Sequence, residues 1–180
     1  MSDHPRILKQ QIVAQSRLFC VEELHLEFSN GATTQYERLL GSKHGAVLVV
    51  PVQDDDTILL IREYAAGTGR YEIGLPKGRV ESGEDLLDAA NRELKEEIGF
   101  GANQLTQLTS LTLAPGYFNH TTHVILAQDL YPERLPGDEP EPIEVVPWSL
   151  SDLPNLMHRD DFTEARSIAA LYLAQSHLKG

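Results

Sequence analysis

The chain has 180 residues, of which 41% are hydrophobic and 23% charged, a balance typical of one globular domain with a small extension. Its net charge of −12 argues against the clustered basic surface that nucleic-acid binding requires, so no nucleic-acid partner is expected. An anionic substrate would need bound metal ions or a few well-placed Arg and Lys side chains.

The cysteine content and the N-terminal sequence indicate the cellular compartment in which the protein is expected. Cys20 is the single cysteine, so neither an intramolecular disulfide nor a cysteine-based zinc site is expected. The N-terminal MSDHPRILKQQ has no apolar signal region, and no later apolar run approaches the length of a membrane span. We therefore expect a cytoplasmic protein with no membrane partner.

The first part of the chain has the alternation of β-strands. Residues 12–40 alternate around Ser29-Asn30-Gly31, and Asn-Gly favours a tight turn, which predicts a β-hairpin. We assign 1–42 to an N-terminal β extension and 43–180 to the main domain. The β-branched run at 45–52 predicts a strand buried on both faces, and further strands are expected at 58–64 and 71–75.

The clearest helix is predicted over residues 84–98. Leu86, Ala90, Leu94 and Ile98 recur at every fourth position and form an apolar stripe, with Ser82 as the expected N-cap. Glycines at 99 and 101 are expected to end it. Strands at 105–113 and 122–128, a proline-rich acidic loop at 130–144 and a last helix at 162–178 complete the pattern, which favours an α/β sandwich.

Three glutamates crowd one side of this helix. Glu93 and Glu97 are four residues apart and Glu96 lies between them, away from the apolar stripe. One reading is a solvated face, with Arg92 paired to Asp88 and Glu96. The other is a site for a hard divalent cation such as Mg²⁺, which prefers oxygen ligands. The residues alone leave both readings open.

The stretch GRVESGEDLLDAANRELKEEIGF (78–100) decides between them by resemblance. It is similar to the Nudix box, G-x5-E-x7-R-E-U-x-E-E-x-G-U, in which U is an apolar residue. The matching residues are Gly78, Glu84, Arg92, Glu93, Leu94, Glu96, Glu97, Gly99 and Phe100. The chain resembles a Nudix hydrolase, which implies an α/β/α sandwich with a mixed central sheet and, here, an antiparallel β-hairpin extension.

The resemblance also implies roles for the residues of the box. Glu93 and Glu97 would be the principal Mg²⁺ ligands, with Glu96 a third ligand or a base and the carbonyl of Lys77 or Gly78 adding an oxygen. Mn²⁺ is a substitute for Mg²⁺. Arg92 would orient the glutamates, and Glu84 and Gly99 would support the loop and helix of the box.

Residues outside the box resemble the branch of the family that cleaves ADP-ribose. Before the box, the resemblance implies that Arg62 and Glu63 bind the diphosphate or the adenine and that Glu72 lies near the loop. After it, Pro115 and Tyr117 occupy positions that mark substrate preference. The hairpin resembles a dimer-forming β-domain that reaches the partner's site, where Phe28, Tyr36 or Arg38 would contact adenine. The family's Leu-Pro-Ala-Gly is Leu-Pro-Lys-Gly here, which adds a cation at Lys77.

The acidic loop carries two candidates for a general base. Glu139 and Glu141 lie where ADP-ribose pyrophosphatases place a mobile glutamate, although a solvated loop has the same composition.

The expected function is Mg²⁺-dependent hydrolysis of the diphosphate in ADP-containing compounds (ADP-ribose, diadenosine di- and triphosphate, NADH), with release of AMP, by a homodimer acting on a small nucleotide. The alternatives are Nudix activity on nucleotide sugars or nucleoside triphosphates, and a nucleotide-sensing module without catalysis.

Overall fold

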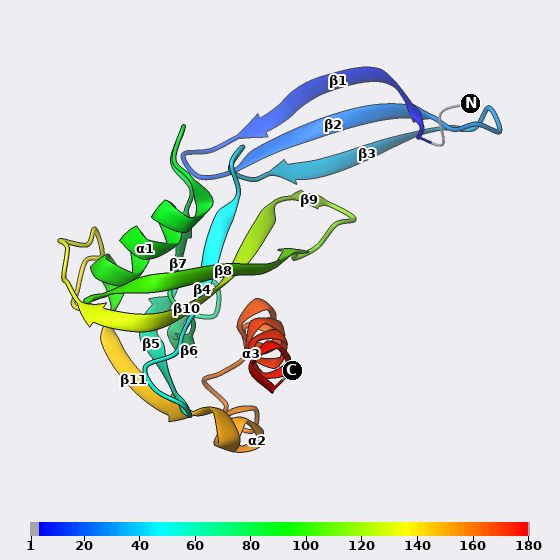
Figure 1. Cartoon of the computed structure of the whole chain (residues 1–180). Coiled ribbons are helices and arrows are strands. Elements are labelled where there is room, and N and C mark those ends of the chain that lie inside the picture. The colour runs from blue at the N-terminus through cyan, green and yellow to red at the C-terminus, as the bar shows by residue number, and fades with distance from the viewer. Residues whose placement is uncertain (1–3, 180) are drawn as a thin grey trace. The chain divides into compact units, whose positions relative to one another are not determined.

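The computed structural model describes residues 4–179, and the chain divides into two compact units (Figure 1). The N-terminal unit contains the residues up to Lys43 together with Thr112–Thr121. The large unit contains His44–Leu111 and the residues from Thr122 onward. Each unit is described by itself below.

The N-terminal unit is built on an antiparallel sheet. Its strands are β1 (Arg6–Gln15), β2 (Cys20–Glu27) and β3 (Thr33–Leu40), and β9 (Phe118–Asn119) joins β3 in parallel. The predicted hairpin is β2–β3, and its turn contains Gly31 at a φ of 81°, which glycine adopts without strain. The sequence analysis did not predict β1, whose residues are all exposed.

The large unit contains two sheets. The first has the strand order β7 (Lys77–Arg79), β4 (Ala46–Pro51), β10 (Thr121–Pro132) and β8 (Phe100–Thr112), and the second has the order β11 (Glu144–Ser149), β5 (Thr57–Ala65) and β6 (Arg70–Gly74). Strand β10 pairs with β4 in parallel, whereas β7 pairs with β4 antiparallel. The first sheet of the large unit contains both parallel and antiparallel pairs and is therefore mixed, as expected.

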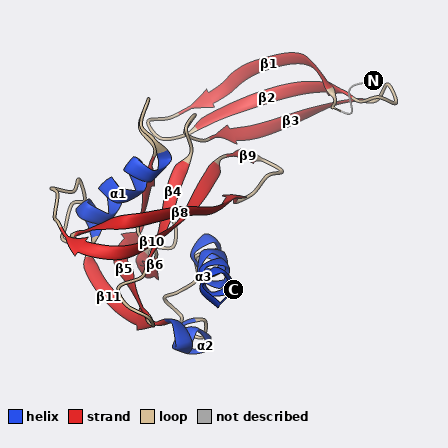
Figure 2. Cartoon of the chain, in the orientation of Figure 1, coloured by secondary structure: helices blue, strands red, loops and turns tan. Residues whose placement is uncertain are grey.

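The helices of the large unit lie on both sides of its strands (Figure 2). They are α1 (Leu86–Glu97), α2 (Leu153–Leu156) and α3 (Ala165–Lys179), with a short 3-10 turn, η1 (Leu150–Asp152), before α2. Side chains alternate along β4: Val47 and Val49 pack in one apolar cluster with α1, and Leu48 and Val50 pack in another with α3. This arrangement is the predicted α/β/α sandwich.

Several boundaries differ from the prediction. The N-cap of α1 is Asp85, whose side chain accepts a hydrogen bond from the Leu87 amide at 2.8 Å, and not Ser82. Gly99 follows the helix at a φ of 77°, as expected of a helix-ending glycine. Helix α3 begins at Ala165 and not at Phe162, which is a buried core residue. Strand β11 was not predicted from the sequence.

Within residues 4–179, the structure contains no helix that is long and apolar enough to cross a membrane.

Candidate active site

The loop that leads into the box is fixed from two sides. The amide of Val49 in β4 donates to the Pro76 carbonyl at 2.8 Å, and the Leu75 amide donates to the buried Ser167 hydroxyl at 3.2 Å. The Ile73 amide donates to the Asp161 carbonyl at 2.6 Å. Because main-chain atoms of β4 and of Asp161 and the side chain of Ser167 hold it, the backbone at the start of the box has a defined position.

Two of the three box glutamates lie inside the protein. Glu93 is 8% exposed and Glu97 is 4% exposed, so the alternative reading of a solvated face does not hold for either. Glu97 Oε2 accepts a hydrogen bond from the Lys77 amide at 2.9 Å. The carboxylate of Glu93 fills the space beside Gly78, where a Cβ atom would lie only 1.8 Å from Glu93 Oε1. Glycine at 78 is therefore required for Glu93 to point into the site.

Arg92 gathers the remaining carboxylates. Its guanidinium donates to Glu84 Oε1 at 2.8 Å, to Glu93 Oε1 at 2.7 Å and to Glu96 Oε2 at 3.0 Å. It also donates to the Arg79 carbonyl at 3.0 Å. The solvated-face reading paired Arg92 with Asp88 and Glu96. In the structure Arg92 pairs with Glu96 and, in place of Asp88, with Glu84 and Glu93. Arg92 fixes the loop before the helix to the helix itself.

Burial changes the protonation of these groups. Burial raises the pKa of Glu97 to about 8, against the opposing effects of the Lys77 charge and amide. Burial also raises the pKa of Glu93, with smaller upward contributions from the charges of Glu96 and Glu139. The hydrogen bond from Arg92, in contrast, lowers the pKa of Glu84. The site therefore holds two buried carboxylates that a further cation would stabilise in their charged form.

A cavity of about 910 Å³ opens over these carboxylates. The box supplies one wall, from Lys77 to Ser82 and from Arg92 to Glu97, and the loop after β10 supplies the other, with Gly137 and Glu139. A Cβ atom at Gly137 would lie 2.3 Å from Glu139 Oε2, so this carboxylate lies against the Gly137 backbone. The structure thus brings the predicted Glu139 together with the box glutamates.

The residues around this cavity fit a divalent cation. Carboxylate and carbonyl oxygens are the ligands that Mg²⁺ prefers, and Glu93, Glu96 and Glu97 offer them on one helix beside the Lys77 and Gly78 backbone. Within the described part of the chain, no three His, Cys, Asp or Glu side chains already converge as a ligand set, since Glu93 and Glu96 face Arg92. Binding would require a side-chain rotation of Glu93 away from Arg92.

A second cavity, of about 340 Å³, lies beside the first and shares Glu139 with it. Arg62, Glu63, Tyr71 and Glu141 are among its lining residues. Lys77, which lines the first cavity, forms an ion pair with Glu63, which lines the second. The predicted Arg62 and Glu63 therefore lie next to the box, as the resemblance implied.

The remaining predicted residues lie elsewhere. Glu72 is buried and faces away from both cavities, since its carboxylate accepts from Arg70 at 2.7 Å and from Thr163 at 3.1 Å. The other predicted residues belong to the N-terminal unit; they are Phe28, Tyr36, Arg38, Pro115 and Tyr117. All of them except Tyr117 line a cavity of about 380 Å³ in that unit. Arg38 is engaged there by Glu22 at 2.7 Å, and Tyr117 is 62% exposed.

The sequence analysis missed Tyr71 and Ser167. Tyr71 donates to Glu141 Oε1 at 2.6 Å, and the Arg62 guanidinium lies 4.7 Å from the centre of its ring. Ser167 supports Leu75, as described above. No local motif marks either residue, because their partners lie 70 and 92 residues away in the chain.

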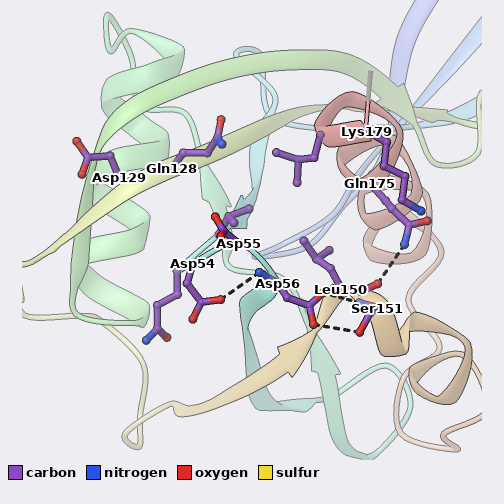
Figure 3. A pocket seen from close by; sticks show the side chains of 12 residues that line it. Asp54, Asp55, Asp56, Gln128, Asp129, Leu150, Ser151, Gln175 and Lys179 are labelled. Carbon is purple, nitrogen blue, oxygen red and sulfur yellow. Dashed lines mark hydrogen bonds between the residues drawn. The ribbon is translucent and has the colours of Figure 1, made fainter.

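Another cavity of the large unit, of about 500 Å³, lies beside the β4–β5 turn (Figure 3). Two of its carboxylates are engaged by the protein itself: Asp54 accepts from the Asp56 and Thr57 amides, and Asp56 accepts from the Ser151 amide at 2.8 Å. We assign these aspartates to the turn and not to a ligand.

Comparison with known families and proteins identifies the fold. The NUDIX domain model matches residues 42–171, and the model of the NudE-type Nudix hydrolase N-terminal domain matches residues 5–38. The chain belongs to the Nudix hydrolase family. Nudix hydrolases are generally dependent on divalent metal ions, in agreement with the carboxylate cluster.

Relatives within the Nudix family resemble the chain over almost its full length. ADP compounds hydrolase NudE of Escherichia coli (strain K12) is 52% identical, over 98% of this chain and 94% of that protein. ADP-ribose pyrophosphatase of Bacillus subtilis (strain 168) is 30% identical, over 93% of this chain and 94% of that protein. A crystal structure of an ADP compounds hydrolase matches with a TM-score of 0.92 at 52% identity, over 98% of this chain and 95% of that one.

Proposed function

We propose that this Nudix hydrolase cleaves the diphosphate bond of compounds that contain an ADP half, with release of AMP. The observation that carries the proposal is the set of buried box glutamates at a cavity shared with Glu139, in a chain 52% identical to an ADP compounds hydrolase. ADP-ribose, diadenosine di- and triphosphate and NADH are the expected substrates. Water attacks one phosphorus, the bridging P–O bond breaks, and AMP leaves with a second phosphorylated product.

Mg²⁺ is the proposed metal, with Mn²⁺ as a substitute. Glu93, Glu97 and Glu96 would hold it with the carbonyl of Lys77 or Gly78. When bound, the cation offsets the diphosphate charge and makes water more acidic. Glu93 would be one of the residues that hold the cation, Arg92 would keep Glu84 and Glu96 in place, and Glu139 would accept the proton of the attacking water.

The two halves of the substrate require different contacts. Arg62 and Glu63 are the proposed contacts to the diphosphate or the adenine, because they line the cavity next to the box. Phe28, Tyr36 or Arg38 of the partner subunit would contact the adenine, since aromatic and guanidinium faces stack on bases. Pro115 and Tyr117 are the proposed markers of substrate preference. A Tyr36→Ala variant should then raise KM for ADP-ribose more than it lowers kcat.

A homodimer formed through the 1–42 extension is also proposed. The outer strand β1 leaves Ile7, Leu8, Ile12 and Val13 exposed, and a monomer seldom leaves such a row in water. A cytoplasmic location remains a prediction of the sequence.

A substrate panel tests the proposed function. Purified protein with Mg²⁺ is given ADP-ribose, diadenosine triphosphate, NADH, GDP-mannose and a nucleoside triphosphate, and products are separated by chromatography. ADP-ribose should yield AMP and ribose 5-phosphate, and kcat/KM should be higher for the ADP compounds than for GDP-mannose or the triphosphate. A preference for either of the last two would refute the ADP specificity. Full activity of Glu97→Gln would refute the metal assignment.

A further inference from the structure

The loop between β10 and β11, residues 133–143, is attached to the rest of the large unit at two places. At its start, the Glu133 amide donates to the Gly99 carbonyl and the Leu135 amide to the Lys95 carbonyl, both at 3.1 Å. Lys95 Nζ also pairs with Glu133 at 2.9 Å. The first attachment thus holds the loop to the C-terminal half of α1.

The second attachment combines apolar packing of Ile143 against the cluster beside α1 with one side-chain hydrogen bond. Tyr71 on β6 donates its hydroxyl to Glu141 Oε1 at 2.6 Å. The Tyr71 ring is itself fixed, since Arg62 lies over its face and Tyr64 meets it edge to face with ring centres 5.6 Å apart. A fixed donor on a strand therefore holds the far end of the loop.

Residues 136–140 span the distance between these attachments. They contain Gly137, whose backbone lies against the Glu139 carboxylate and whose Cβ position is 3.7 Å from the Glu96 carbonyl. Glu139 therefore depends on both ends of the loop for its place over the box. Glu141, in contrast, uses its carboxylate to accept from Tyr71 and is not among the residues that line the box cavity.

We propose that Tyr71 is a positioning residue that places Glu139 over the box through its hydrogen bond to Glu141. This inference rests on the proposed function, and it separates two glutamates that the sequence could not distinguish. Glu139 faces the reacting diphosphate, and Glu141 anchors the loop. Tyr71 acts through Glu141 and does not itself touch the water or the metal.

Two substitutions separate the roles. Tyr71→Phe keeps the ring beneath Arg62 and removes only the donor, so kcat for ADP-ribose should fall about threefold to tenfold, within the range of one typical hydrogen bond, with little change in KM. Glu141→Gln keeps an acceptor oxygen for Tyr71 but cannot serve as a base, so kcat should fall less than in Glu139→Gln. An equal loss in Glu141→Gln and Glu139→Gln would overturn the assignment.

A double-mutant cycle tests whether Tyr71 acts through Glu139. In the Glu139→Gln background, Tyr71→Phe should cause little further loss of kcat, because the side chain that it positions is already inactive. The same fold loss in both backgrounds would overturn the proposal. Tyr172→Phe is the matched control, since Tyr172 is an exposed tyrosine on α3, and its kcat should equal that of the wild type.

A measurement without substrate keeps this inference separate from the proposed function. The ¹⁵N relaxation of the Gly137, Asp138 and Glu139 amides should show lower order parameters in Tyr71→Phe than in the wild type or Tyr172→Phe. Unchanged order parameters would overturn the positioning role even if the enzyme cleaves ADP-ribose. If the wild type cleaves no ADP compound, the proposed function fails, and the relaxation data still decide whether Tyr71 orders the loop.

Discussion

Glu97 is almost completely buried at the candidate metal site, and its burial lowers the stability of the metal-free protein as the pH rises. Burial raises its pKa to about 8 from 4.5, so between these two pH values the folded protein keeps a proton that the unfolded chain has lost. The free energy of unfolding of the metal-free protein should therefore fall as the pH rises through this window, by at most about 1.4 kcal/mol per pH unit from this group.

The variant Glu97→Gln should make this fall smaller and leave only the contribution of Glu93, whose pKa burial also raises, because the amide carries no charge at any of these pH values yet can still accept from the Lys77 amide. Urea unfolding with a chelator between pH 5.5 and 8.5 measures the slope. Glu84→Gln is the control: Arg92 lowers the pKa of Glu84, so this group titrates below the window and its loss should leave the slope unchanged. A wild-type slope that persists in Glu97→Gln would contradict the assignment.

Gly78 provides a second test at the residue scale. The Cβ atom of Gly78→Ala would meet the Glu93 carboxylate at 1.8 Å, so Glu93 must shift by more than an ångström. Misplacement of about 1 Å costs on the order of 100-fold in rate, and we expect a loss of that size in kcat. Gly67→Ala is the control, because nothing lies within 4 Å of its Cβ position. Comparable kcat values for the two variants would show that Glu93 is not held as described.

At the scale of elements, the sequence prediction and the structure differ in the N-cap residue of helix α1. Asp85 accepts from the Leu87 amide, whereas the predicted cap was Ser82. Asp85→Ala should lower the free energy of unfolding by about 1 kcal/mol, and Ser82→Ala should leave it unchanged. Urea titration of both variants measures the difference, and the reverse order would favour the predicted cap.

The elements that the sequence predicted well are those with buried apolar faces. The four-residue spacing from Leu86 to Ile98 located α1 by its apolar stripe, and the continuous β-branched run at 45–52 located β4, which is buried on both faces. Strand β1 has no buried face, so its sequence has no clear alternation. Strand β11 contains Pro147, which weakened the strand signal, although Val146 on the same strand still packs against the core.

The part of the candidate site whose residues lie close together in the sequence could be predicted. The box residues lie within one loop and one helix, so Arg92, Glu93 and Glu97 could be named from the sequence alone. Their burial could not, because the loop with Glu139 that covers them comes some forty residues later. Tyr71 and Ser167 act across the fold, and the Glu72 carboxylate accepts from Arg70 and Thr163, the second of which lies 91 residues away in the chain.

At the scale of the whole molecule, the exposed residues of β1 make assembly testable. If the chain forms a dimer through its N-terminal extension, light scattering should give twice the chain mass of 20.0 kDa. A charge at the row of exposed apolar residues, as in Ile12→Lys, should then give the mass of a monomer. Tyr172→Lys, which alters a similarly exposed residue on α3, should remain a dimer. A dimeric Ile12→Lys would place the interface elsewhere.

The hydrogen bond from Leu75 to Ser167 also bears on how the protein is made. Leu75 lies just before the box, and its support comes from a residue that follows it by 92 positions. During synthesis the box therefore leaves the ribosome long before the segment that fixes its backbone. The glutamates of a nascent chain would consequently remain without their final geometry until α3 has been added, so hydrolytic competence would arise only after α3 has been synthesised.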